Sequence, residues 1–238
     1  MRKALWKILF RLRSRFASLG SARECNLCGW RGGRFLTAGQ GVKRRPDALC
    51  PSCRSVERHR LAHALLREAI APGQRTLHVA PEPSVTGWLR AVSAEYLSID
   101  LDGRLASRAM DLTHLDLADA SFSLVYCSHV LEHIPDDAAA MREMRRVLQP
   151  GGLAVVQVPV KGEITDEDLR ITDPEERERR FDQRDHVRVY GLDVATRLKS
   201  AGFAVDVLDA DLLDPAVVAR HGLTYATTRQ VFLCRPDS

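Results

Sequence analysis

Residues 119–134 read Asp-Ala-Ser-Phe-Ser-Leu-Val-Tyr-Cys-Ser-His-Val-Leu-Glu-His-Ile, and residues 148–152 read Leu-Gln-Pro-Gly-Gly. The first stretch contains an apolar run at 124–127 of the length typical of a buried strand. Residues 137–148 have the apolar spacing of a helix, and a second apolar run follows at 153–158. A strand, a helix and a strand in this order predict a parallel βαβ unit.

The same alternation continues on both sides of this unit. Further strands are expected at 76–80, 96–99, 203–208 and 231–234, and further helices at 54–70, 85–92 and 192–201. The sequence therefore predicts an α/β fold with a doubly wound, mostly parallel sheet.

Length and composition limit the remaining possibilities. The chain has 238 residues, of which 45% are hydrophobic and 28% charged, as is typical of one folded α/β domain with a small appendage. No stretch is long and apolar enough for a transmembrane helix, so we expect a soluble protein. Residues 1–60 contain 15 Lys and Arg against 3 Asp and Glu. This basic region suggests nucleic acid, an acidic lipid surface or an acidic glycan as a partner, and a solvated charged face is the alternative.

Residues 1–20 have the pattern of a basic amphipathic helix. Its apolar side carries Leu5, Ile8, Leu9, Leu12 and Phe16. Arginines interrupt the apolar run that a secretory signal peptide needs, so a cytoplasmic protein is expected. The helix can dock at a membrane surface or pack on its own protein, and the sequence leaves both open.

Residues 21–58 carry four of the six cysteines as two Cys-x2-Cys pairs, Cys25 with Cys28 and Cys50 with Cys53. Two such turns can direct four thiolates at one tetrahedral zinc ion, and four thiolates leave no open position for catalysis. The spacing predicts a structural zinc ribbon that folds with its metal, with disulfide pairing as the alternative. Cys127 and Cys234 lie in strand-like runs and are expected to be buried packing residues.

Asp100 closes the expected strand 96–99. Ligands of open α/β sheets bind beyond the carboxyl ends of the strands, and a carboxylate there can accept two hydrogen bonds from a ribose diol. The alternative for Asp100 is a turn or helix-capping residue.

With Asp111-Leu112, 119–134 and 148–152 taken together, residues 76–235 resemble the class I S-adenosylmethionine-dependent methyltransferases, in particular the type 11 methyltransferase domain. The run 50–60, Cys-Pro-Ser-Cys-Arg-Ser-Val-Glu-Arg-His-Arg, and the run 185–191, Asp-His-Val-Arg-Val-Tyr-Gly, are similar to a bacterial subgroup with an N-terminal zinc ribbon. The resemblance implies a seven-stranded Rossmann-like sheet within a methyltransferase domain at 59–238, and S-adenosylmethionine as cofactor.

The resemblance also implies roles for individual residues. Asp100 would hold the ribose, and Asp111 with the backbone of Leu112 would meet the adenine. Ser128 and His129 would follow the fourth strand at the reaction centre. The alternative for Asp111 is a solvated turn.

The first loop departs from the family pattern. Family members usually carry glycines after the first strand, whereas residues 78–83 here read His-Val-Ala-Pro-Glu-Pro. We expect Ala80 and Glu82 to line the cofactor site, with Glu82 as partner of the methionyl ammonium group or, alternatively, as a helix-initiating residue.

Residues 160–191 form a connection longer than usual and are expected to be a cap that determines substrate specificity. A short helix should begin there at Pro174, with Asp173 as its N-cap. His186, Arg188 and Tyr190 alternate and could point together into the cleft. A neutral acceptor needs a general base, for which His129 and His186 are the candidates, while Glu132 and His133 are expected only to organise the turn before Pro135.

The sequence thus predicts an S-adenosylmethionine-dependent methyltransferase with a structural zinc ribbon, acting on a small-molecule or glycan acceptor. Two alternatives stay open. One is an RNA methyltransferase that uses the basic ribbon, and the other is an inactive methyltransferase-like module that binds nucleic acid or serves as a scaffold.

Overall fold

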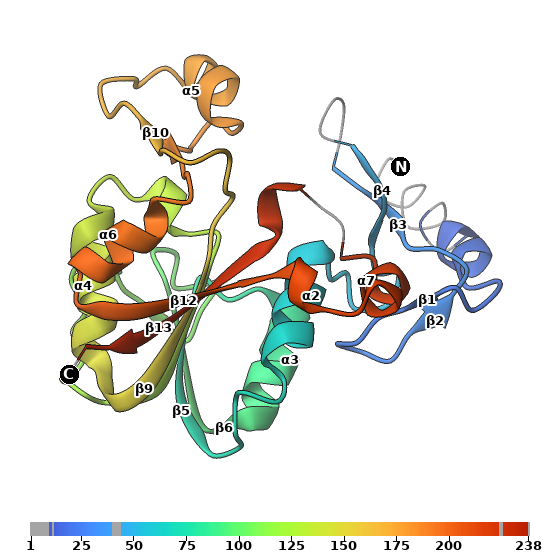
Figure 1. Ribbon diagram of the computed structural model, residues 1–238, viewed down its shortest axis with the longest axis horizontal. Helices are drawn as coiled ribbons and strands as arrows, with labels where there is room; N and C mark the ends of the chain where they lie inside the picture. Colours follow the sequence, from blue (N-terminus) through green and yellow to red (C-terminus); the bar gives the residue numbers. More distant parts are fainter. Residues whose placement is uncertain (1–9, 11, 40–43, 224–225, 238) are drawn as a thin grey trace. The chain divides into compact units, whose positions relative to one another are not determined.

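The computed structural model describes residues 10, 12–39, 44–223 and 226–237 (Figure 1). It forms two compact units, each built from separate parts of the sequence. Unit 1 comprises residues 1–70, 83–88 and 210–229, and unit 2 comprises residues 71–82, 89–209 and 230–238. The ribbon-like region and the sheet therefore belong to different units.

Unit 2 is built on a seven-stranded sheet, as the sequence predicts. Its strands lie in the order β12-β13-β9-β8-β5-β6-β7, and all neighbours are parallel except for β13, which is antiparallel to both β12 and β9. The strands are β5 (Gln74–Val79), β6 (Ser93–Asp100), β7 (Arg108–Ala109), β8 (Phe122–Ser128), β9 (Leu148–Gln157), β12 (Phe203–Asp209) and β13 (Gln230–Pro236). Six of the seven coincide with the expected apolar runs.

Helices α4 (Asp137–Val147) and α6 (Val194–Ser200) pack beside each other on this sheet (Figure 1). Helix α4 begins where the Asp136 side chain accepts a hydrogen bond from the Ala139 amide at 2.9 Å. Its apolar residues recur at helical spacing and are fully buried: Ala140, Met141, Met144 and Val147. Their burial fixes α4 against the strand that follows it, which directs the loop before α4 to the carboxyl edge of the sheet. Helix α3 (Pro83–Val92) follows the first strand.

Residues 160–191 form a small substructure of unit 2. Strand β10 (Asp166–Glu167) pairs with β11 (Arg188–Val189), and helix α5 (Pro174–Phe181) lies between them in sequence. Asp173 caps α5, as expected, by accepting a hydrogen bond from the Glu176 amide at 3.0 Å. Ile171, Phe181 and Val189 form a separate apolar cluster. We refer to residues 160–191 as the cap segment.

Unit 1 contains four short strands, β1 (Arg23–Glu24), β2 (Arg31–Gly32), β3 (Leu36–Ala38) and β4 (Arg45–Leu49). They pair as two antiparallel hairpins. The unit extends beyond the expected ribbon at 21–58, because it also includes helix α2 (Glu57–Leu66), the turn η3 (Ala210–Leu212), helix α7 (Pro215–His221) and the turn η4 (Ala226–Thr228).

Arg60 of α2 joins these parts of unit 1. Its guanidinium lies 4.0 Å from the centre of the Phe35 ring and donates to the carbonyl oxygens of Ala48, Ser55, His221 and Gly222 at 2.6 to 3.0 Å. The side chain is completely buried. Because its bonds to the carbonyls of His221 and Gly222 span 161 and 162 residues of sequence, Arg60 stabilises the packing of distant segments of unit 1.

Half of the amphipathic helix expected at 1–20 lies outside the described residues. Residues 12–17 are helical, and Phe16 and Leu19 are exposed by 66% and 68%. Leu5, Ile8 and Leu9 belong to the part that is not described. In the described part of the chain, no helix is long and apolar enough to cross a bilayer.

Candidate functional site

The carboxyl ends of three neighbouring strands meet at one level of the sheet. Val79 of β5 lies opposite both Ile99 of β6 and Cys127 of β8. Ala80, Asp100 and Ser128 are therefore equivalent positions at the edge, spread over about 10 Å because neighbouring strands are about 4.8 Å apart. An open α/β sheet binds ligands at this edge. Three of the predicted cofactor residues are thus brought together.

The first loop turns sharply at Ala80. This residue has φ of +46°, in the left-handed region that favours glycine, and its amide donates to the Ile99 carbonyl at 2.8 Å. Alanine therefore takes a conformation that glycine adopts more readily. Glu82 occupies the N-cap of α3 with Pro83 after it, but its side chain makes no capping hydrogen bond. Its position agrees with either expected role.

Asp100 and Asp111 both organise loops after their strands. Oδ1 of Asp100 accepts from the Asp102 amide at 2.8 Å, and the described residues give Oδ2 no hydrogen-bond donor. Oδ1 of Asp111 accepts from the amide and the hydroxyl of Thr113, each at 2.8 Å. Leu112 is buried in the main core. Asp100 is thus oriented with one oxygen left for a ligand, and the exposed Asp111 uses Oδ1 within the turn that follows it.

Strand β8 ends at Ser128, and His129 directly after it has an unusual backbone conformation. Ser128 is 5% exposed, and its hydroxyl oxygen is buried without a hydrogen-bond partner in the described part of the chain. His129 has φ of +56°, and its amide donates to the Gln157 carbonyl at 2.8 Å. Positive φ at a non-glycine residue costs about 1 to 2 kcal/mol and is typical of functional sites.

Glu132 orients His129. It lies in the short turn η2 (Leu131–His133), is 1% exposed, and places Oε1 3.2 Å from Nδ1 of His129. Burial raises the pKa of Glu132, but the hydrogen bond and the charge of His129 outweigh burial and lower it below its usual value. The ionised carboxylate faces Nδ1 of His129, so Nδ1 carries a proton and Nε2 is the nitrogen that points away from Glu132.

His186 lies beside this turn, as its place in the expected cleft suggests. It is 2% exposed, and its Nδ1 is 2.9 Å from the Phe181 carbonyl oxygen. A carbonyl can only accept, so Nδ1 carries the proton and Nε2 the lone pair. Burial lowers the pKa of His186 below its usual value, which keeps the ring neutral at pH 7.

Arg188 and Tyr190 share the buried side of this segment with His186, but both contact the protein itself. Arg188 is 1% exposed, donates to the carbonyls of Leu131 and Pro135 at 2.8 Å, and pairs with Glu167. The Tyr190 hydroxyl donates to Asp137 at 2.6 Å. The alternation of His186, Arg188 and Tyr190 thus marks one buried face of the cap segment. Arg188 and Tyr190 use this face to hold the segment to the turn after β8 and the start of α4.

Sequence reasoning missed the grouping of Glu132 and His133 with His186. The ligand atoms of these three residues lie within 4.8 Å of one another. His133 was expected only to organise the turn. The available signal was the His-x-x-Glu-His spacing at 129–133, which places two imidazoles and a carboxylate on one short turn.

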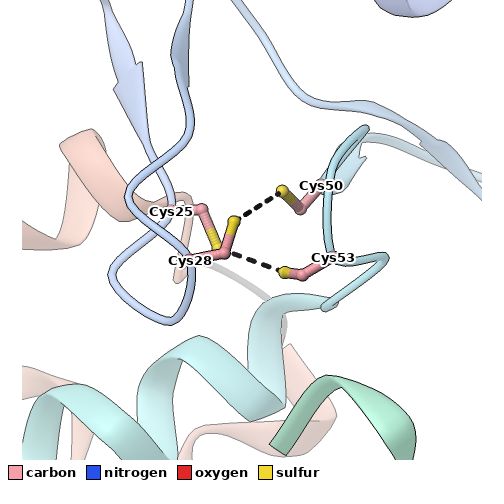
Figure 2. Close-up of side chains that lie close together, drawn as sticks. All are labelled: Cys25, Cys28, Cys50 and Cys53. Atoms are coloured by element: carbon pink, nitrogen blue, oxygen red, sulfur yellow. Dashed lines mark hydrogen bonds between the residues drawn. The ribbon is translucent and has the colours of Figure 1, made fainter. Parts of the chain in front are cut away.

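The four cysteines of unit 1 converge, as Figure 2 shows. Sγ of Cys25 lies 3.6 Å from Sγ of Cys53, and Sγ of Cys28 lies 3.7 Å from Sγ of Cys50. Tetrahedral zinc with Zn–S bonds of about 2.3 Å separates its sulfurs by about 3.8 Å, while a disulfide needs about 2.05 Å. All four are free thiols in the structure. The donor set and its spacing fit a zinc ion.

The environment of the cysteines also fits a cation. Hydrogen bonds with Cys25 and Cys53, together with burial, raise the pKa of Cys50 well above its usual range. Four thiolates this close repel one another unless a metal compensates their charge. The hydroxyl of Ser55 lies 3.2 Å from the sulfurs of both Cys25 and Cys53, where it can donate to a metal-bound thiolate.

A surface cavity of about 290 Å³ lies beside the amino-terminal parts of the sheet strands, lined by residues such as Arg75, Glu95 and Phe122. The residues that line this cavity lie at the opposite end of the strands from Asp100 and Ser128. The cavity therefore does not belong to the candidate cofactor site.

Comparison with known proteins shows which proteins this chain is similar to. Residues 78–156 match the family model of a methyltransferase domain. A demethylmenaquinone methyltransferase of Mycolicibacterium paratuberculosis is 35% identical over 128 residues, which are 49% of this chain and 55% of that protein. Methyltransferase GfsG of Streptomyces halstedii is 40% identical over 67 residues, which are 28% of this chain and 24% of that protein. The chain thus spans about half the length of the first relative and about a quarter of the second.

Solved structures share the fold at lower identity. An S-adenosylmethionine-dependent methyltransferase from Mesorhizobium loti superposes with a TM-score of 0.56 at 18% identity, covering 74% of this chain and 97% of that one. The 1,6-didemethyltoxoflavin-N1-methyltransferase of Burkholderia thailandensis, solved with S-adenosylhomocysteine, gives 0.53 at 16% identity over 76% and 79% of the two chains. The chain therefore shares the Rossmann-like fold of these S-adenosylmethionine-dependent methyltransferases, and its residues 78–156 match a methyltransferase domain.

Proposed function

We propose that the protein transfers a methyl group from S-adenosylmethionine to a small-molecule or glycan acceptor. The observation that carries this proposal is the alignment of Ala80, Asp100 and Ser128 at the carboxyl edge of three neighbouring strands. The matched methyltransferase domain covers all three positions. The demethylmenaquinone and didemethyltoxoflavin methyltransferases among its relatives and neighbours carry small-molecule names, which favours an acceptor of that kind.

Each end of the cofactor would meet different residues. Asp100 would accept hydrogen bonds from the ribose diol, and Asp111 with the Leu112 backbone would contact the adenine. Ala80 and Glu82 would line the methionyl end, where a carboxylate can pair with the ammonium group. When bound, the cofactor supplies an electrophilic methyl group on sulfur.

The protein's own contribution to the reaction is alignment and a base. We assign the base to His129, because Glu132 orients its ring and Nε2 is an acceptor buried at the end of β8. His186 is the second candidate, since its Nδ1 bond to Phe181 likewise leaves Nε2 as an acceptor. The cap segment, held by Arg188 to the turn after β8, would exclude water and select the acceptor.

The zinc ion proposed for Cys25, Cys28, Cys50 and Cys53 would be structural. Its four thiolates leave no coordination position for a substrate. It would stabilise unit 1 around Cys25, Phe35 and Cys50, which form a small cluster of buried residues there.

Metabolite profiling tests the proposed function directly. A strain lacking the protein should accumulate a metabolite that is one methyl group lighter than a product of the parent strain. Complementation with the wild-type chain should restore the methylated product, and the Asp100→Ala variant should restore much less of it. A deletion strain with an unchanged methylated-metabolite profile, together with no S-adenosylhomocysteine binding by the purified protein, would contradict the proposal.

A further inference from the structure

Glu132, His133 and His186 form a compact cluster at the end of β8. Their ligand atoms lie within 4.8 Å of one another. One backbone bond and one side-chain bond hold them there. The Val187 amide donates to the Glu132 carbonyl at 3.0 Å, and the Arg188 guanidinium donates to the Leu131 carbonyl at 2.8 Å. The cluster is therefore a consequence of how the cap segment is attached, and it needs no attraction among the three side chains themselves.

Each side chain of the cluster has an outer partner that fixes its orientation. Nδ1 of His186 faces the Phe181 carbonyl at 2.9 Å, Nδ1 of His133 lies 3.3 Å from Asp185 Oδ2, and Oε1 of Glu132 lies 3.2 Å from His129. A carbonyl or carboxylate beyond one ring nitrogen leaves the other nitrogen with a lone pair. Metal-binding histidines in proteins have such outer partners.

Two members of the cluster are buried with unused acceptor atoms. Glu132 is 1% exposed and His186 is 2% exposed. Within the described ranges, neither Oε2 of Glu132 nor Nε2 of His186 has a hydrogen-bond partner. Buried acceptors of this kind are costly unless a donor or a cation satisfies them. The side chain of His133 is 32% exposed, which gives an ion a route into the cluster and room for the ring to adjust.

We propose that Glu132, His133 and His186 bind a divalent transition-metal ion that is separate from the four-cysteine site. Two imidazoles and one carboxylate suit zinc, manganese, iron or cobalt better than magnesium or calcium, which prefer oxygen ligands. Three protein ligands leave at least one coordination position open, in contrast to the closed four-cysteine site.

The open position gives the ion a role that rests on the proposed function. The site follows Ser128 and His129, so a bound ion would coordinate the oxygen of an acceptor hydroxyl and lower its pKa. That oxygen loses its proton to Nε2 of His129 and forms a bond to the methyl carbon, while the methyl–sulfur bond breaks and its electron pair stays on sulfur. The inference therefore assigns the acceptor to the hydroxyl class.

Cobalt titration of the full chain tests the metal site. Thiolates bound to cobalt give an intense charge-transfer band, whereas imidazole and carboxylate ligands do not, so total bound cobalt and thiolate-bound cobalt can be measured separately. We expect the wild-type chain to bind a second cobalt ion outside the cysteines. His186→Ala and Glu132→Gln should weaken that second ion by at least about 100-fold and leave the thiolate band unchanged. The control variant His114→Ala, which removes an exposed histidine of the same unit, should bind both ions.

The outcomes separate this inference from the proposed function. A wild-type chain that binds only thiolate-ligated cobalt, and no additional zinc or manganese, would overturn the metal site. Retention of the second ion by folded His186→Ala and Glu132→Gln variants would overturn it as well. S-adenosylhomocysteine calorimetry on the same samples tests the function independently. Cofactor binding without a second metal refutes only the metal site, and a second metal without cofactor binding supports the site and refutes the function.

Discussion

Replacement of Asp100 by alanine should weaken binding of the cofactor by about 2 kcal/mol. The Asp102 amide uses one lone pair of Oδ1, so the carboxylate keeps Oδ2 and the second lone pair of Oδ1 for the two ribose hydroxyls. A hydrogen bond to a charged group contributes about 1.5 to 3 kcal/mol, but water replaces part of it at this half-exposed edge. A loss of about 2 kcal/mol corresponds to a roughly 30-fold weaker affinity.

Calorimetry with S-adenosylhomocysteine measures this loss, because that ligand has the same ribose and is chemically stable. Asp100→Asn keeps an acceptor for the Asp102 amide but loses the charge and replaces the second oxygen with an amide donor, so it should fall between the wild type and the alanine variant. Asp102→Ala is the matched control. Its carboxylate binds the exposed Arg104 and its amide donor is retained, so affinity should stay within about twofold of wild type. Unchanged affinity in a folded Asp100→Ala variant, or an equal loss in Asp102→Ala, would refute the ribose assignment.

Three further predictions concern the metal, the cap segment and the reaction. Cys50→Ser should reduce bound zinc to well below one ion per chain, and unit 1 should unfold while the sheet of unit 2 keeps its core. Metal analysis and circular dichroism measure these two effects. Retention of stoichiometric zinc would exclude the four-thiolate site. Arg188→Met should destabilise the protein by about 3 kcal/mol, because the carbonyls of Leu131 and Pro135 lose a buried donor. The control Arg170→Met, at an exposed ion pair, should leave the melting temperature nearly unchanged. Equal melting temperatures for the two variants would contradict this. His186→Ala should lower turnover by about 100-fold or more with nearly intact S-adenosylhomocysteine affinity, and near-normal turnover of His186→Gln would leave only a hydrogen-bonding role for this residue.

The sheet could be predicted because its strands are local apolar runs separated by helical spacing. The exception is β7, whose two residues, Arg108 and Ala109, have no apolar pattern and pair only because β6 offers a free edge. Propensity and pattern carry no information on so short a strand, whose pairing is set by tertiary context.

The candidate site was partly predictable for a similar reason. Ala80, Asp100 and Ser128 each end a recognisable strand, so the register of the sheet brings them together. The contact of His186 with Glu132 depends on residues 54 positions apart and on the hydrogen bonds of Arg188, which no local pattern encodes. Alternation could show that His186 and Arg188 share a face, but it could not show that Arg188 contacts backbone carbonyls.

The bonds of Arg60 to the carbonyls of His221 and Gly222 have a consequence for protein synthesis. The ribosome makes the cysteine-containing segment early, but unit 1 cannot be completed until residues 210–229 have emerged. The position of β13 between β12 and β9 delays unit 2 in the same way, since this strand begins only at Gln230. Each unit therefore needs residues beyond position 209 to complete its fold. Nascent chains stalled before residue 210 should bind zinc weakly and remain sensitive to protease over their whole length.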